Sequence, residues 1–223
     1  EPYRRQRQMC IRASYNIMSQ IYTVKRLDSM AFEWQLKEIE LTEKYDLENY
    51  NISQTYSQIS SYYINTNQPE KALEALKKAD ATAYSPTQKI SVQLEYVNYY
   101  SKFGDMQAAE KILNECKTAF DQDKRLWSIK KRLYNIEYVY YLQSKQYPKA
   151  LEAAKKQEAE ELNLSESIQN SVHYLTKGKI YSNMGNMSEA IKYLQMYIEA
   201  EDSLKIANEQ MASSEFATLL EVE

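Results

Sequence analysis

Five pairs of tyrosine and alanine constrain the fold of this chain more than any other feature of its sequence. The two residues of each pair are nine positions apart, and successive alanines lie 41, 37, 41 and 40 residues apart. A nearly constant period of this length is typical of proteins built from stacked helix pairs, each pair being one repeat. The five pairs are Tyr22 and Ala31, Tyr63 and Ala72, Tyr100 and Ala109, Tyr141 and Ala150, and Tyr181 and Ala190.

The composition favours long helices over strands. Only 3 Gly and 4 Pro occur among the 223 residues, whereas tight hairpins between strands need more of both. The 21 Tyr provide apolar surface together with a hydroxyl that can remain in contact with water. These features indicate an all-α, thin structure in which few residues are deeply buried.

Each repeat reads as two antiparallel helices joined by a short turn. Gly104 and Gly185 mark two of these turns, because glycine adopts the left-handed backbone conformation without strain. The residues that follow them, Asp105 and Asn186, are good helix N-caps. Other predicted starts are a capping box from Ser85 to Gln88, with Pro86 at the first helical position, and a cap at Asp28 and Ser29 in the first repeat.

The small alanine of each pair allows its helix to approach the preceding helix closely. An apolar or small residue four positions later lies on the same helix face. The tyrosines therefore predict a packing seam between paired helices rather than a cofactor site. The residues four positions after the alanines are Leu76, Leu113, Ala154 and Leu194.

This pattern resembles the tetratricopeptide repeat family. The tyrosine, the Gly-Asp or Gly-Asn turn and the alanine occupy that motif's places over nearly all of residues 12–204, and the best match is 171–202. The period of 37–41 residues exceeds the family's 34, and the usual closing proline is mostly missing. The resemblance implies a right-handed α-solenoid of about five helix pairs over residues 1–200. It also implies a C-terminal capping or connecting helix over residues 201–223.

The resemblance also implies a concave groove lined by the first helix of each pair, and a protein or peptide as the partner. The groove positions carry mostly amide and hydroxyl groups, which can hydrogen-bond to an extended backbone. They lack the cluster of Lys and Arg that would clamp a carboxylate terminus. The residues projected onto the groove are Asn16, Gln20, Gln54, Ser57, Ser61, Asn98, Asn135, Lys179 and Asn183.

Other functional classes lack support in the sequence. The single histidine, His173, has no cysteine nearby to complete a zinc site, and three glycines do not make a phosphate-binding loop. We therefore expect no enzyme activity, no cofactor and no metal. The net charge of −3 argues against a nucleic-acid partner, and no apolar run of about 20 residues could span a membrane. Cys10 and Cys116 form no metal-binding spacing, and we expect both thiols to be buried.

The tail resembles the end of repeat arrays in bacterial envelope sensors, and residues 27–31 resemble their first turn. The matching tail segments are residues 197–204 and 215–223. By this resemblance the chain is a non-catalytic sensing or interaction module of a signal-transduction protein of the histidine kinase or transcriptional regulator type. It would lie in the periplasm as part of a membrane-anchored protein, with a homodimer through the C-terminal helix. The alternative is a free-standing cytoplasmic scaffold or co-chaperone.

Overall fold

The chain folds into helices arranged as five successive pairs. In the computed structural model, which describes residues 2–47, 50–160 and 166–221 (side chains of 3–47, 50–160, 171–206 and 209–210), no strand occurs in the described part. The all-α prediction of five helix pairs is confirmed. The elements are α1 (Pro2–Val24), α2 (Asp28–Tyr45), α3 (Ile52–Asn65), α4 (Pro69–Thr82), α5 (Pro86–Phe103), α6 (Met106–Gln122), the 3-10 helix η1 (Lys124–Ile129), α7 (Lys130–Gln143), α8 (Tyr147–Ala159), α9 (Glu166–Asn183) and α10 (Met187–Glu221).

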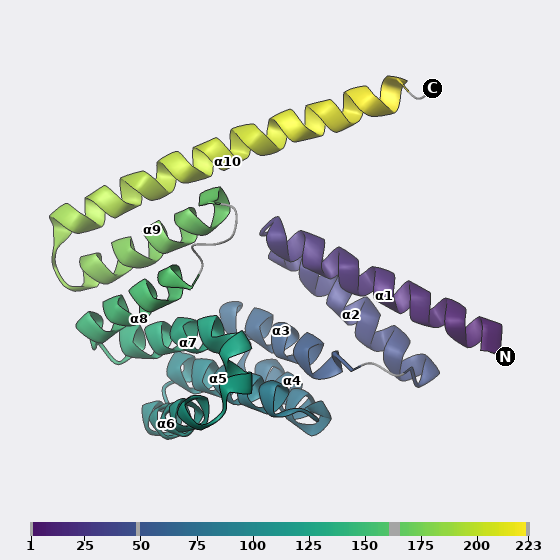
Figure 1. The fold of residues 1–223 in the computed structure, drawn as a ribbon, viewed down its shortest axis with the longest axis horizontal. Coiled ribbons are helices and arrows are strands. Elements are labelled where there is room, and N and C mark those ends of the chain that lie inside the picture. The colour runs from purple at the N-terminus through teal and green to yellow at the C-terminus, as the bar shows by residue number, and fades with distance from the viewer. Residues whose placement is uncertain (1, 48–49, 161–165, 222–223) are drawn as a thin grey trace. The chain divides into compact units, whose positions relative to one another are not determined.

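The contacts between helices divide the chain into two compact units, Glu1–Lys130 and Lys131–Glu223. In the first unit α1 packs on α2, α3 on α4 and α5 on α6, while α2 contacts α3, and α5 contacts both α3 and α4 (Figure 1). In the second unit α8 contacts α9, and α9 runs alongside α10. The sequence predicts neither this division nor η1, which packs against α5 and α6.

The turn inside each helix pair uses one residue in the left-handed conformation. This residue lies five positions before the alanine in all five pairs, although only two of the five are glycine. A left-handed conformation costs a residue with a Cβ atom roughly 1–2 kcal/mol. The turns therefore keep one geometry whatever residue occupies them. The φ angles are 58° at Arg26, 59° at Asn67, 100° at Gly104, 61° at Lys145 and 77° at Gly185.

The helix caps follow the sequence prediction at three sites and depart from it at one. Ser85 forms the predicted capping box. The Asp105 side chain accepts a hydrogen bond from the Ala108 N–H at 3.0 Å, and the Asn186 side chain accepts one from the Glu189 N–H at 3.3 Å. The predicted cap at Asp28 and Ser29 is wrong, because Leu27 is the N-cap of α2 and makes no side-chain cap. The left-handed turn residue fixes where the helix starts, so Asp28 lies in the first turn.

The anchor alanines are buried as the spacing predicts. None of the five is more than 4% exposed. The Ser60 hydroxyl donates to the Ala72 carbonyl at 3.0 Å, so the two helices of the second pair touch there. A Cβ atom placed on Gly178 would lie 2.9 Å from the Leu194 side chain, which shows the same close approach between α9 and α10. The anchor alanine, together with a small residue of the first helix in the second and fifth pairs, thus sets the spacing within those pairs.

One further expectation, the burial of both cysteines, needs correction. Cys116 is buried, but Cys10 is exposed on α1 because no described helix covers that face. The boundary expected between residues 200 and 201 falls inside α10, which runs 35 residues from Met187 to Glu221. No glycine or proline follows residue 200 to break that helix. The spacing of apolar residues in the tail also predicts an apolar stripe along this helix. Most of that stripe lies outside the described side chains: Ala207, Met211, Phe216, Leu219, Leu220 and Val222.

Candidate functional site: a polar pocket between the first two helix pairs

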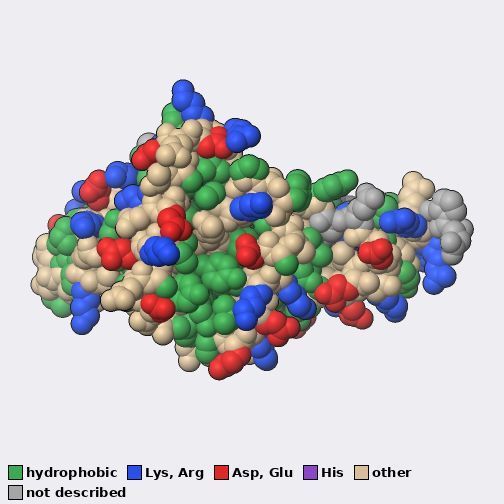
Figure 2. Space-filling model, turned by 90° about the horizontal axis from the view of Figure 1, so that it is seen from below, with side chains coloured by type: hydrophobic (Ala, Val, Ile, Leu, Met, Phe, Trp, Pro, Cys, Tyr) green, Lys and Arg blue, Asp and Glu red, His purple; other side chains and the backbone are tan. Residues whose placement is uncertain are grey.

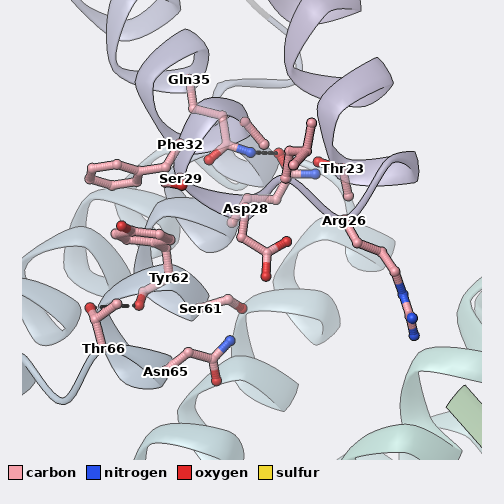
Figure 3. A pocket seen from close by; sticks show the side chains of 13 residues that line it. Thr23, Arg26, Asp28, Ser29, Phe32, Gln35, Ser61, Tyr62, Asn65 and Thr66 are labelled. Carbon is pink, nitrogen blue, oxygen red and sulfur yellow. Dashed lines mark hydrogen bonds between the residues drawn. The ribbon is translucent and has the colours of Figure 1, made fainter. Parts of the chain in front are cut away.

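A pocket of about 530 Å³ lies within the first unit, where the first helix pair meets α3 (Figure 3). We call the residues that surround it the first seam, residues 23–35 and 58–66. Ligand pockets in proteins commonly have volumes of ~300–1,000 Å³, so this one has room for a side chain or a short peptide segment. Its walls come from the end of α1, the turn to α2, the first half of α2 and the second half of α3: Thr23, Arg26, Leu27, Asp28, Ser29, Ala31, Phe32, Gln35, Gln58, Ser61, Tyr62, Asn65 and Thr66.

One wall of the pocket is a pair of stacked aromatic rings. The rings of Phe32 on α2 and Tyr62 on α3 have centroids 4.0 Å apart and planes inclined by 13°. Phe32 also meets the anchor residue Tyr63 edge to face at 5.2 Å. Phe32 therefore packs against both tyrosines, and the three rings form one aromatic cluster beside the pocket.

The opposite side of the pocket is polar. Figure 3 shows the carboxylate of Asp28 pointing into the space above Ser61 and Asn65. Among the described residues this carboxylate has no hydrogen-bond or ion-pair partner, and Asn65 is exposed. The Ser61 hydroxyl donates to the carboxylate of buried Glu95 at 2.6 Å, so its oxygen keeps its lone pairs for another donor.

A pair of amides closes the inner end of the pocket. The Gln35 side chain, which is 5% exposed, donates to the Gln58 side-chain oxygen at 3.1 Å. This bond joins α2 to α3 across 23 positions of sequence. It satisfies a buried amide that would otherwise lie unpaired against apolar neighbours.

Several residues projected onto the groove are already engaged inside the first unit. Asn16 donates at 3.1 Å to Glu38, whose side chain is fully buried, and Gln20 donates to Asn16 at 2.6 Å. Asn98 donates at 2.9 Å to Glu95, the carboxylate that also receives Ser61. These side chains therefore stabilise buried carboxylates. Of the nine projected residues, only Ser61 lines the pocket.

The remaining projected residues are scattered. Ser57 is buried and donates to the Ser53 carbonyl at 3.0 Å, while Gln54 is exposed on α3. The other three belong to the second unit, where Asn135 is half-buried, Lys179 is exposed, and Asn183 donates to the Lys179 carbonyl at 2.8 Å.

Sequence reasoning missed most of the pocket, although a signal for it exists. Four positions after the anchor alanine, the other four repeats carry Leu or Ala, and the first repeat carries Gln35. Gln35 is polar at a position where the four other repeats are apolar, which indicates that packing alone did not select this residue. Position-by-position comparison of the repeats would have identified Gln35, but its partner Gln58 requires the fold.

The described residues provide no other clear chemical site. Among them, no group of three or more His, Cys, Asp or Glu could hold a metal ion, and His173 is buried in α9. No described helix is long and apolar enough to cross a membrane. Figure 2 shows Lys and Arg interspersed with Asp and Glu on the displayed face, with no extended field of either sign.

Comparison with known proteins gives two family matches. The family described as 26S proteasome subunit RPN7 matches residues 23–156. The tetratricopeptide repeat family matches residues 174–203. No curated protein matches the chain.

Among solved structures, two crystal structures of MamA are similar. One has 18% identity and a TM-score of 0.44, and the match covers 84% of this chain and 96% of that one. The other has 19% identity and a TM-score of 0.42, covering 86% and 92%.

Proposed function

This chain belongs to the family described as 26S proteasome subunit RPN7, and on that premise we propose that it is a protein-interaction scaffold. Its tetratricopeptide repeats support a role in binding other proteins. The proposed binding site is the pocket of the first seam, which would hold an extended segment of a partner protein. The observation that carries this proposal is a pocket lined by the stacked rings of Phe32 and Tyr62 on one side and by a set of polar side chains on the other.

The polar character of the first seam supports a binding role. Fully burying a leucine side chain stabilises a protein by about 1.5–3 kcal/mol, and the other repeats place Leu or Ala where the first repeat has Gln35. The first repeat lacks this stabilisation, and the loss of stability at a single position is common at functional sites.

The proposal can be tested with a matched pair of variants. Asn65 lines the pocket, and Lys102 occupies the same position of the next repeat, seven residues before its alanine. Peptides selected on the purified chain from a random display library should bind Asn65→Trp at least tenfold more weakly, because the indole would fill the pocket. Lys102→Trp should bind them like the wild type. Calorimetric titration checks both, and peptides that bind Asn65→Trp normally, or a library without binders, would overturn the proposal.

The cellular setting of the scaffold is a second proposal. The resemblance of the tail to bacterial envelope sensors favours a periplasmic signalling protein, and the long continuous α10 would suit transmission of a signal away from the last helix pair. Immunoblotting of fractionated cells of the source organism separates this from a free-standing cytoplasmic scaffold. The signalling proposal expects a band much larger than 26.3 kDa in the membrane fraction. A soluble band near that mass contradicts it.

A homodimer through α10 is a separate proposal, and light scattering on the purified chain tests it. The expected mass is twice 26.3 kDa. A monomer at all accessible concentrations contradicts it.

A further inference from the structure

We infer that the pocket of the first seam selects an arginine side chain of the bound segment. This inference rests on the proposed function and specifies its ligand. Three of the hydroxyl groups that line the pocket already donate their hydrogen bonds to other groups of the protein. Thr23 donates to the Ser19 carbonyl at 2.9 Å, Ser61 to Glu95 at 2.6 Å, and Thr66 to the Tyr62 carbonyl at 2.9 Å.

The oxygens of Thr23 and Ser61 can still accept a hydrogen bond, whereas the Thr66 oxygen already accepts one from the Gln68 side chain at 2.9 Å. The Asp28 carboxylate adds a full negative charge, and the buried carboxylate of Glu95 lies directly behind Ser61. The one basic residue of the lining, Arg26, extends away from the pocket in Figure 3. The site is therefore rich in acceptors and negative, and it suits a ligand that offers donors and positive charge.

The aromatic rings beside the pocket favour arginine over lysine as the basic side chain of the ligand. A guanidinium group is planar, stacks on aromatic faces and carries five N–H donors in a fixed fork, whereas an ammonium is a compact and strongly hydrated charge. Phe32 and Tyr62 each cover one face of the other's ring, so a guanidinium can pack only against the outer faces and ring edges of this pair. No described cation lies over either ring, although Lys71 lies 5.5 Å over the neighbouring Tyr63. An arginine against this wall can reach Asp28 on the opposite side with its fork.

Asp28 also has a structural role that the test must separate from binding. An acidic residue in the first turn of a helix is favourable because it faces the positive end of the helix dipole. Glu70 has the same position type in α4 but does not line the pocket. Glu70→Gln is therefore the matched control for Asp28→Asn.

The experiment uses three short capped peptides as probes, Gly-Arg-Gly, Gly-Lys-Gly and Gly-citrulline-Gly, titrated into the full chain and followed by NMR. Citrulline has the shape of arginine without its charge. We expect the arginine peptide to shift the amide signals of residues 28, 61 and 65, to bind at least tenfold more tightly than the citrulline peptide, and to bind more tightly than the lysine peptide. Asp28→Asn should reduce its affinity to that of the citrulline peptide, and Glu70→Gln should leave it unchanged.

Other outcomes overturn the inference in distinguishable ways. Equal binding of the arginine and citrulline peptides, or no arginine binding up to about 10 mM, removes the charge selectivity. Tighter binding of lysine assigns the site to ammonium instead. If library peptides still lose affinity on Asn65→Trp in these cases, the scaffold proposal survives and only the arginine assignment fails. If the arginine peptide binds as expected but library peptides ignore Asn65→Trp, the pocket is an arginine site and the scaffold proposal fails.

Discussion

The first seam contains an open polar pocket, whereas the corresponding region between the second pair and α5 buries a large apolar side chain, together with the Glu95 carboxylate at the position of Gln58. We call this region the second seam, residues 64–76 and 95–103, which occupy the same repeat positions as the first seam. Leu76 stands where the first seam has Gln35, and it is fully buried in a cluster with residues such as Ile59 and Val92. Phe103 stands where the first seam has Thr66, and its ring lies 5.0 Å from that of Tyr99.

The comparison indicates that side chains, not the backbone, decide whether a seam contains an open pocket. Both inner turns have the same left-handed geometry, at Arg26 and at Asn67, and both helix pairs bury their anchor alanine. One repeat architecture thus supports a closed interior and an open pocket.

The largest expected effect comes from opening the second seam. Leu76→Gln should lower the free energy of unfolding by about 3 kcal/mol, because it removes buried apolar surface and buries an amide without a partner. Urea unfolding followed by circular dichroism measures the loss. The control is Leu36→Gln, since Leu36 is 41% exposed on α2 and its substitution should cost less than about 0.5 kcal/mol. Similar losses for the two variants would mean that the seam is not the packed interior described here.

A smaller effect is expected from closing the first seam. The double variant Gln35→Leu, Gln58→Leu removes both members of the amide pair, so neither is left unpaired. It also adds apolar surface at the position where the second seam has Leu76. We expect a gain of about 1 kcal/mol in unfolding free energy, the net of added burial against one lost hydrogen bond. The same variant should lose binding of the arginine peptide. A variant that is both less stable and still able to bind would show that the polar pair serves packing alone.

The repeat and its turns could be predicted from the sequence because they depend on residues close together in the chain. The nine-residue spacing of tyrosine and alanine gives the pairing of the helices, and Ser85, Asp105 and Asn186 give three helix starts. The cap at Asp28 was misplaced because two adjacent residues, Asp28 and Ser29, both have capping side chains, while the true start is set by the turn geometry at Arg26.

The pocket could not be predicted because it depends on contacts between separate repeats. Gln35 meets Gln58, and Ser61 meets Glu95 across 34 positions of sequence, so the periodic pattern of one helix pair contains neither contact. Projection from the family motif placed Asn16 and Asn98 on a binding groove because amides suit such a surface. The structure instead shows both donating to buried carboxylates, Glu38 and Glu95, that a motif has no means to anticipate.

The smallest expected effect concerns the turn beside the pocket. Arg26→Asn should raise the free energy of unfolding by about 0.5 kcal/mol, because asparagine tolerates the left-handed conformation better than arginine does. The natural Asn67 already occupies this position in the turn of the second seam. Thermal unfolding detects the gain, and Lys145→Asn, at the same turn position of the second unit, should give a similar gain. A gain for Lys145→Asn without one for Arg26→Asn would show that the Arg26 side chain stabilises the first seam through its own contacts. The turn residue would then contribute to the stability of the first seam.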